Sequence, residues 1–278
     1  MKVTLWGTRG SLASPGPDTV RYGGNTTCVS VEGSDGTMLV LDAGTGLRNV
    51  TQICSPDTRR FHILLTHLHM DHIEGLPFFT PLNRAGVSVD IFGPASTTLS
   101  LKDRLLRYLS PPLFPVSLRE LLADLRFYGL PSVPVQIGEF TITADLVIHY
   151  NATLGYRVES PDATLTFLPD HNPALGVTSF PHRPEWTSGY SLAKDANLLI
   201  HDSQYTSEEF IARPGFGHSS IENAFLFAEL AGVKQLVTFH HDPTHNDDML
   251  DRMVEDACTR LQPGFQVIPG CEGMVVEI

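Results

Sequence analysis

Cysteine is scarce in this chain: the 278 residues include only four, and no two of them form a Cys-x-x-Cys pair. Cysteines scattered in this way do not indicate a disulfide framework, so a reduced, cytoplasmic protein is expected. The sequence also lacks any apolar run that approaches the length of a membrane span. Residues 1–7 read as a first strand and not as a secretion signal.

Positive charge is also low. The chain has 19 Lys and Arg residues against 31 Asp and Glu residues, which gives a formal net charge of −12 at pH 7. Proteins that hold nucleic acid by electrostatic attraction usually carry a basic face, so this balance argues against a polyanionic partner. Bound metal ions would add local positive charge that a residue count omits. The hydrophobic fraction of 42% is ample for a core.

Short β-like runs separated by Gly, Ser and Asp turns dominate both ends of the chain. We expect strands at residues 3–6, 27–32, 38–42, 62–66, 141–149, 154–159, 164–168, 197–201, 235–239 and 273–278. We expect helices at residues 99–109, 117–125, 221–231 and 247–261. The Pro-rich segment 111–134 has no clear period, which predicts a surface excursion beside the site. Apolar strands that end in His67 and in His240 indicate two αβ halves packed sheet to sheet.

Four candidate metal ligands fall within the sequence Thr-His-Leu-His-Met-Asp-His of residues 66–72. The four are His67, His69, Asp71 and His72. They follow an apolar run at residues 61–65 that is typical of a buried strand, and a tight turn after a strand can fan such side chains out. Imidazole and carboxylate groups suit zinc, iron or manganese. Folding alone needs no such density of ligands, so the motif predicts a metal centre.

Polar residues in four further segments could complete this centre. They are His149, Asp170, His218, His240 and His241. Apolar runs precede His149, Asp170 and His240, whereas His218 lies directly before an amphipathic helix. A polar residue where a strand leaves the core is ordinary on its own. Similar placement in several segments, beside a dense ligand motif, favours a shared site.

On these residues the chain resembles the metallo-β-lactamase superfamily, in the branch that contains ribonuclease Z and small-molecule phosphodiesterases. Residues 7–11 and 21–26 are similar to the opening of that branch, and residues 41–46 to its next turn. Residues 67–75 match the HxHxDHxxG signature of the family. The likeness spans nearly the whole chain. It implies an α/β fold, a four-layer αββα sandwich, formed by a single domain over residues 1–278.

The resemblance also implies two divalent metal ions, zinc by expectation, with manganese or iron as alternatives. The implied ligands are His67, His69 and His149 for the first ion, Asp71, His72 and His240 for the second, and Asp170 as the bridge. Two cations about 3.5–4 Å apart can lower the pKa of a shared water to give a metal-bridging hydroxide at neutral pH. Asp71 could also orient or deprotonate that water. Asp42 and Asp202 are expected to orient ligating histidines.

His218, in the sequence Gly-His-Ser-Ser, has two interpretations. Ser219 and Glu222 form a Ser-x-x-Glu capping box, so His218 could merely precede a helix. In the resemblance it matches a histidine that ribonuclease Z places near the leaving group. We therefore expect His218 to contact phosphate or to donate a proton to the leaving oxygen. His241 should point away from the centre if its strand continues.

A few other polar residues are expected to stay outside the centre. We interpret Glu74 as a solvated charge at a helix start and not as a ligand. His171, His201 and His245 are expected to be polar surface groups or groups behind the ligands.

The expected function is that of a cytoplasmic phosphodiesterase acting on a small cyclic or nucleotide-like phosphodiester. Ribonuclease Z proper carries a long arm that grips tRNA, and no segment here has its Gly-rich, basic character. The segment between His149 and Asp170 has room only for two strands and a turn, so tRNA is not the expected partner. A true β-lactamase would be exported and typically has cysteine at the position of Asp170.

Two alternatives stay open at this point. One is a lactone or thioester hydrolase that uses the same hydroxide and depends less on His218. The other is a metal-dependent nucleotide-binding module with little turnover. The sequence leaves the oligomeric state open, and a membrane partner is not expected.

Overall fold

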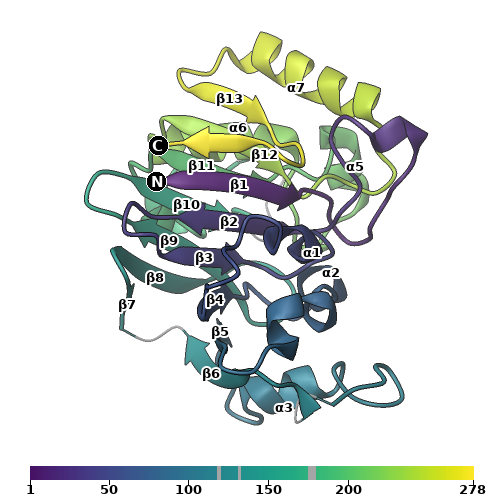
Figure 1. Cartoon of the computed structure of the whole chain (residues 1–278). Helices are drawn as coiled ribbons and strands as arrows, with labels where there is room; N and C mark the ends of the chain where they lie inside the picture. The colour runs from purple at the N-terminus through teal and green to yellow at the C-terminus, as the bar shows by residue number, and fades with distance from the viewer. Residues whose placement is uncertain (118–119, 131–132, 175–179) are drawn as a thin grey trace.

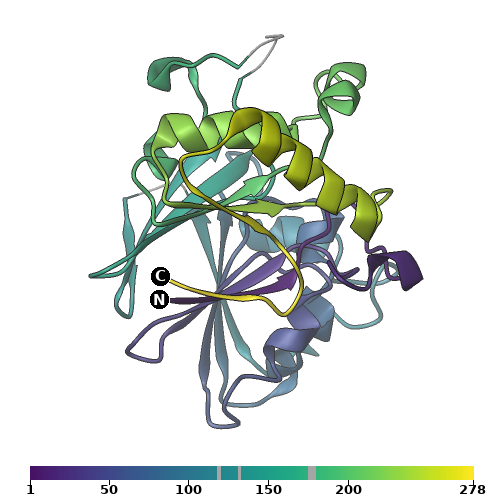
Figure 2. The same cartoon turned by 90° about the horizontal axis from the view of Figure 1, so that it is seen from above.

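Two mixed seven-stranded sheets pack face to face in this protein, with helices on both outer faces (Figures 1 and 2). The computed structural model describes residues 1–117, 120–130, 133–174 and 180–278. The predicted four-layer αββα sandwich is confirmed. The expectation of a single domain over residues 1–278 stays a prediction.

The first sheet combines an antiparallel and a parallel half. Its strands, in spatial order, are β14 (Val275–Glu277), β1 (Lys2–Gly7), β2 (Cys28–Glu32), β3 (Met38–Leu41), β4 (Arg60–Leu64), β5 (Ser88–Pro94) and β6 (Asp124–Leu130). Neighbours from β14 to β3 are antiparallel, and neighbours from β3 to β6 are parallel. The parallel strands therefore end at the same edge of the sheet.

The second sheet repeats this plan. Its strands, in spatial order, are β13 (Gln266–Pro269), β12 (Gln235–Phe239), β11 (Leu198–Asp202), β10 (Thr164–Leu168), β9 (Thr153–Glu159), β8 (Phe140–Val147) and β7 (Val135–Ile137). Neighbours from β10 to β13 are parallel, and neighbours from β7 to β10 are antiparallel. The strands β8, β10, β11 and β12 consequently run in one direction and end at one edge.

Helices cover the outer face of each sheet (Figure 1). Beside the first sheet lie α1 (Leu47–Val50), α2 (Met70–Ile73), η2 (Leu76–Phe78), η3 (Thr80–Asn83) and α3 (Leu101–Leu106). Beside the second lie α4 (Tyr190–Ala193), α6 (Ile221–Ala231) and α7 (Asp247–Leu261). The remaining helices are η1 (Pro17–Thr19), η5 (Pro184–Trp186) and α5 (Ser207–Ala212). Among the described residues, no helix combines the length and the apolar character needed to cross a bilayer.

The main core lies between the two sheets. Leu5 and Leu41 from the first sheet and Phe167 and Phe239 from the second are fully buried in one apolar cluster. Side chains of a strand alternate between its two faces, so the other face of each sheet packs against the helices. In the central strand β11 all five residues are buried, as expected for a parallel strand covered on both faces.

The Pro-rich segment 111–134 differs from its prediction. The helix expected at residues 117–125 is wrong where the structure describes it, because β6 begins at Asp124. Residues 118–119 and 131–132 lie outside the described residues. β6 pairs in parallel with β5 along its whole length, although its own residues are largely exposed. Backbone pairing with a buried neighbour forms this strand, and the sequence of an exposed edge strand carries little apolar signal. The strands β5, β7 and β13 were likewise not predicted.

Tyr156 of β9 ties the second sheet to the strand that leads into the histidine motif. Its ring is fully buried, and its hydroxyl donates a hydrogen bond of 2.7 Å to the carbonyl oxygen of Leu65. We expect Tyr156→Phe to lower the free energy of unfolding by about 1–3 kcal/mol, because a buried carbonyl loses its partner. Urea unfolding measures this change. The matched variant Tyr128→Phe, at a ring that is 39% exposed, should change stability by less than about 0.5 kcal/mol.

Candidate metal centre

The seven predicted ligands lie at one edge of the two sheets, in segments that follow strands, and two of them, Asp71 and His72, belong to the short helix α2. β4 leads into residues 67–72, and β8, β10 and β12 lead to His149, Asp170 and His240. Because these strands end at the same edge, ligands that are far apart in sequence meet in space. The structure brings together all seven of the predicted ligands.

The first group consists of His67, His69, His149 and Asp170. Their candidate ligand atoms all lie within 4.8 Å of one another. Nε2 of His149 lies 3.5 Å and Nε2 of His67 lies 3.8 Å from Oδ1 of Asp170. Nδ1 of His69 lies 3.4 Å from Nε2 of His149. Three imidazole nitrogens therefore converge beside one carboxylate oxygen.

The second group faces the other oxygen of Asp170. Nε2 of His72 lies 2.9 Å and Nε2 of His240 lies 3.2 Å from Oδ2 of Asp170. Oδ2 of Asp71 lies 3.3 Å from each of these two nitrogens. The carboxylate of Asp170 thus presents one oxygen to each group, which is the arrangement of a bridging ligand.

Several buried polar atoms at this position form no hydrogen bond of acceptable geometry, although Nε2 of His72 lies 2.9 Å from Oδ2 of Asp170. They are Nε2 of His67, Nε2 of His72 and Oδ2 of Asp170. Buried polar groups in folded proteins are normally paired, so these atoms need a partner that the chain itself does not provide. Two groups of imidazole and carboxylate donors are the ligands that divalent zinc, iron or manganese prefers. The donor set therefore fits two divalent cations.

The far sides of two ligating rings in the motif region are held by Asp42 and Thr66. Nδ1 of His72 lies 2.7 Å from Oδ2 of Asp42. The hydroxyl of Thr66 donates to Asp42, and Nδ1 of His67 lies 3.1 Å from that hydroxyl. Asp42 also accepts a hydrogen bond from the backbone NH of Thr66. This network fixes which nitrogen of each ring points into the centre.

Two further rings are held by groups that the sequence analysis missed. Nδ1 of His149 donates to the carbonyl oxygen of Gly217 at 2.8 Å. Nδ1 of His240 donates to the side-chain oxygen of Gln204 at 3.1 Å. Gln204 follows strand β11 and could have been selected on that position. A backbone carbonyl such as that of Gly217 leaves no signal in a sequence.

Two residues of the centre adopt left-handed backbone conformations that are rare for residues other than glycine. Asp42 has φ 57° and His240 has φ 61°. Such strain is concentrated at functional sites, where the surrounding structure holds it in place. A Cβ atom at Gly10 would lie 2.2 Å from Nδ1 of His240, so only glycine leaves room for this ring. The next residue, Ser11, donates its backbone NH to Oδ2 of Asp71 at 2.7 Å.

Burial and neighbouring charges set the protonation of the centre. Burial lowers the pKa of His67 and of His149, which favours the neutral imidazole that a metal needs. Burial opposes ionisation of Asp170, but the adjacent histidines outweigh it and hold its pKa well below the usual range. Burial also opposes protonation of His72, yet Asp170, Asp71 and Asp42 raise its pKa well above normal. A cation on His72 would therefore displace a proton.

His218 lies beside both groups. Its Nδ1 is 2.7 Å from Oδ2 of Asp202, and its ring stacks on that of His240 with 5.0 Å between centroids. Among the residues that the structure describes, Asp202 thus holds His218 and forms no hydrogen bond to any of the seven predicted ligands. The expected capping box is wrong by one residue, because Ser220 caps α6 through the backbone NH of Asn223. The hydroxyl of Ser219 instead donates to the carbonyl of His171.

Of the two positions expected for His171, His201 and His245, on the surface or behind the ligands, the structure excludes the surface. His171, His201 and His245 are buried, and Nδ1 of His171 lies 2.9 Å from Nε2 of His201. Glu74 is not a free charge, because it accepts a hydrogen bond from the hydroxyl of Thr26. It follows α2 instead of starting it. Nε2 of His241 donates to the carbonyl of Gly270, away from the two groups.

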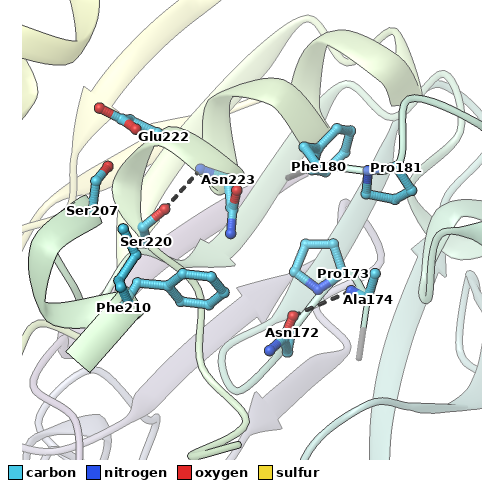
Figure 3. A pocket seen from close by; sticks show the side chains of 11 residues that line it. Asn172, Pro173, Ala174, Phe180, Pro181, Ser207, Phe210, Ser220, Glu222 and Asn223 are labelled. Atoms are coloured by element: carbon cyan, nitrogen blue, oxygen red, sulfur yellow. Dashed lines mark hydrogen bonds between the residues drawn. The ribbon is translucent and has the colours of Figure 1, made fainter. Parts of the chain in front are cut away.

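An open pocket of about 700 Å³ adjoins the first group, with His67 and His69 in its wall. A second hollow, of about 130 Å³, lies beside α5 and α6 (Figure 3). Phe210, Phe180 and Asn172 line this smaller hollow, and none of the seven predicted ligands does. The larger pocket is therefore the approach to the candidate centre.

The contact between Asp42 and His72 generates a prediction about metal affinity. Asp42→Asn keeps the shape of the side chain and tolerates the left-handed backbone, but it removes the charge that orients His72. We expect metal affinity to fall by about 10- to 100-fold, as for other outer partners of ligating histidines. Competition with a chromogenic chelator measures it. The exposed control Asp57→Asn should keep the parent affinity, and equal affinity in both variants would contradict this role.

The matches to known proteins agree with this geometry. The model of the Beta-lactamase superfamily domain matches residues 37–241. A ribonuclease Z from Haloarcula marismortui is 24% identical over 300 residues, which cover 92% of this chain and 91% of that protein.

Solved structures share the fold. The metallo-β-lactamase fold protein YhfI from Bacillus subtilis has a TM-score of 0.72 at 20% identity, covering 100% of this chain and 98% of its own. A diphosphatase of the PhnP family has a TM-score of 0.69 at 18% identity, covering 100% and 97%. The chain therefore belongs to the metallo-β-lactamase superfamily.

Proposed function

We propose that this protein is a binuclear metal-dependent hydrolase that cleaves a small cyclic or nucleotide-like phosphodiester. The observation that carries the proposal is the placement of Asp170, whose two carboxylate oxygens face two separate groups of ligands. His67, His69 and His149 would hold one ion, and Asp71, His72 and His240 the other. Two bound cations would supply charge neutralisation for a phosphate and a water of lowered pKa as the nucleophile.

Two side chains at the centre, Asp71 and His218, have different roles in this proposal. Asp71 is fixed by the backbone NH of Ser11, and neighbouring histidines hold its pKa well below the usual range although burial opposes this. It therefore stays anionic and can orient a water molecule or accept its proton. His218 is fixed through Nδ1 by Asp202, which leaves Nε2 to donate a proton to the leaving oxygen. This arrangement is that of a general acid with a carboxylate that orients its ring.

The preference for a small substrate rests on the net charge of the protein and on the short length of the segment between His149 and Asp170. The curated relative from Haloarcula marismortui is named ribonuclease Z, so precursor tRNA is the competing substrate. The net charge of −12 opposes the binding of a long polyanion. The segment from His149 to Asp170 is taken up by β9, β10 and the turn between them. A cytoplasmic location belongs to the same proposal and is supported by four free cysteines.

Metal content provides the first test. Purified protein should contain about two equivalents of zinc, manganese or iron by mass spectrometry of the metals. Asp170→Asn should lower this content or uncouple the two ions, because the amide oxygen carries no charge to share between them. The control Asp162→Asn lies in the exposed turn between β9 and β10 and should keep both ions. Unchanged metal content in Asp170→Asn would remove Asp170 from its bridging role.

Substrates with different leaving groups distinguish the role of His218 from that of the metal ions. A p-nitrophenolate leaves without a proton, whereas the alkoxide of a ribose must be protonated. We expect His218→Ala to slow hydrolysis of cyclic nucleotides by about 10²- to 10⁴-fold and that of bis(p-nitrophenyl) phosphate far less. Chromatographic quantification of the ring-opened nucleoside monophosphate and the absorbance of p-nitrophenolate measure the two rates.

A panel of substrates distinguishes the alternatives. It contains the two diesters, a lactone, a thioester, a chromogenic β-lactam and a precursor tRNA, each assayed with zinc and with manganese. Hydrolysis of the lactone or thioester alone would replace the phosphodiesterase assignment. Tight nucleotide binding without turnover would indicate a binding module, and cleavage of precursor tRNA alone would overturn the small-substrate proposal.

A further inference from the structure

The pocket of about 700 Å³ beside the metal centre combines an apolar wall with a single cation. Its wall includes Leu68, Pro94, Ala95 and Leu146, and the cation is Arg104 of α3. Among the described residues that line it there is no Asp or Glu. Because His67 and His69 belong to the same wall, a molecule bound at the centre can extend directly into this pocket.

Arg104 lacks the partners that a partly buried guanidinium normally has. Its Nη2 donates to the carbonyl oxygen of Pro94. Its Nε is buried and has no hydrogen-bond partner. Within the part of the chain that the structure describes, no carboxylate forms an ion pair with it. Burial lowers its pKa, so a nearby anion would stabilise its charged form.

The contrast with Arg9 shows that the fold can pair a buried arginine. Arg9 is fully buried, and one of its terminal nitrogens lies 3.7 Å from Asp247. It also donates to the carbonyl oxygens of Gly23 and His245. Three other pockets among the described residues contain an arginine, namely Arg48, Arg60 or Arg260, and each of them also contains an acidic residue. Arg104 is therefore available to an anion from outside the chain.

We propose that Arg104 binds a second anionic group of the substrate. The substrate is then a phosphodiester in which one arm carries a carboxylate or a phosphate, beyond an uncharged body that lies on Leu68 and Leu146. This inference rests on the proposed phosphodiesterase function, because the diester defines which end of the substrate occupies the metal centre. The hydroxyl-bearing residues Ser96 and Thr97 line the same pocket and can donate to the same anion.

Diesters that share one leaving group test the inference. Each carries p-nitrophenol, and the other arm is phenyl, 4-carboxyphenyl, 4-phosphonooxyphenyl or 4-(trimethylammonio)phenyl. With the wild-type protein we expect kcat/KM for an anionic arm to exceed that for the phenyl arm by about tenfold, as for a hydrogen bond to a charged group. The cationic arm should be the poorest. Comparison of the carboxylate with the phosphate shows which anion fits the pocket.

Variants of the same helix separate a local contact from a general effect of charge. Arg104→Gln should bring the ratio of anionic to phenyl arm close to one, and Arg104→Lys should keep part of the preference. Lys102→Gln and Arg107→Gln remove the same charge from exposed positions on and next to α3, and they should keep the wild-type ratio. An equal loss of preference in these controls, or none in Arg104→Gln, would overturn the inference. Metal content and circular dichroism identify any variant that fails to fold.

Binding measured without turnover makes the result independent of the proposed activity. Calorimetry compares 4-carboxyphenyl phosphate with phenyl phosphate on metal-loaded wild type and on Arg104→Gln. We expect the carboxyl group to tighten binding by about tenfold in the wild type only. If no diester is hydrolysed but this difference is found, the proposed function fails and the anion site stands. If the diesters are hydrolysed but the carboxyl group does not tighten binding, the proposed function stands and the anion site is overturned.

Discussion

The carboxylate of Asp170 is the group on which the geometry of the centre depends. It is buried at the junction of two sheets, and its two oxygens face nitrogens from both of them. Taking a carboxylate out of water is unfavourable unless cations or donors surround it. His67 and His72 come from the first sheet, and His149 and His240 come from the second. The buried carboxylate of Asp170 is therefore stabilised by these histidines only when the two sheets are correctly aligned.

The αββα architecture makes this alignment robust. The apolar layer between the sheets fixes the distance between them. This distance in turn determines how far apart the loops at one edge of the two sheets lie. Tyr156 links β9 to the residue before the histidine motif, so the core and the centre share a hydrogen bond. Strain at Asp42 and His240 is tolerated because each residue directly follows a largely buried strand, β3 or β12. A rigid framework with adaptable loops also explains how one superfamily can serve several chemistries.

The local parts of the centre could be predicted from the sequence, and the distant parts needed the family resemblance. His67, His69, Asp71 and His72 form a dense motif whose chemistry can be recognised without any relative. His149 and His240 are single polar residues at strand ends: their similar placement favoured a shared site, and the resemblance identified them as implied ligands. The helices at residues 221–231 and 247–261 agree with their predicted bounds, because both are long and amphipathic. β6 was missed because it forms through pairing at an exposed edge.

The close contact between Gly10 and the ring of His240 has a consequence for the folding of the chain during translation. Pieces from near residue 10, from the middle and from beyond residue 200 must all meet before the second group is complete. A nascent chain that has emerged only as far as β10 displays the motif of residues 67–72 without His240. The second group of predicted ligands is consequently complete only after β12 has been translated, so it cannot guide the earliest steps of folding.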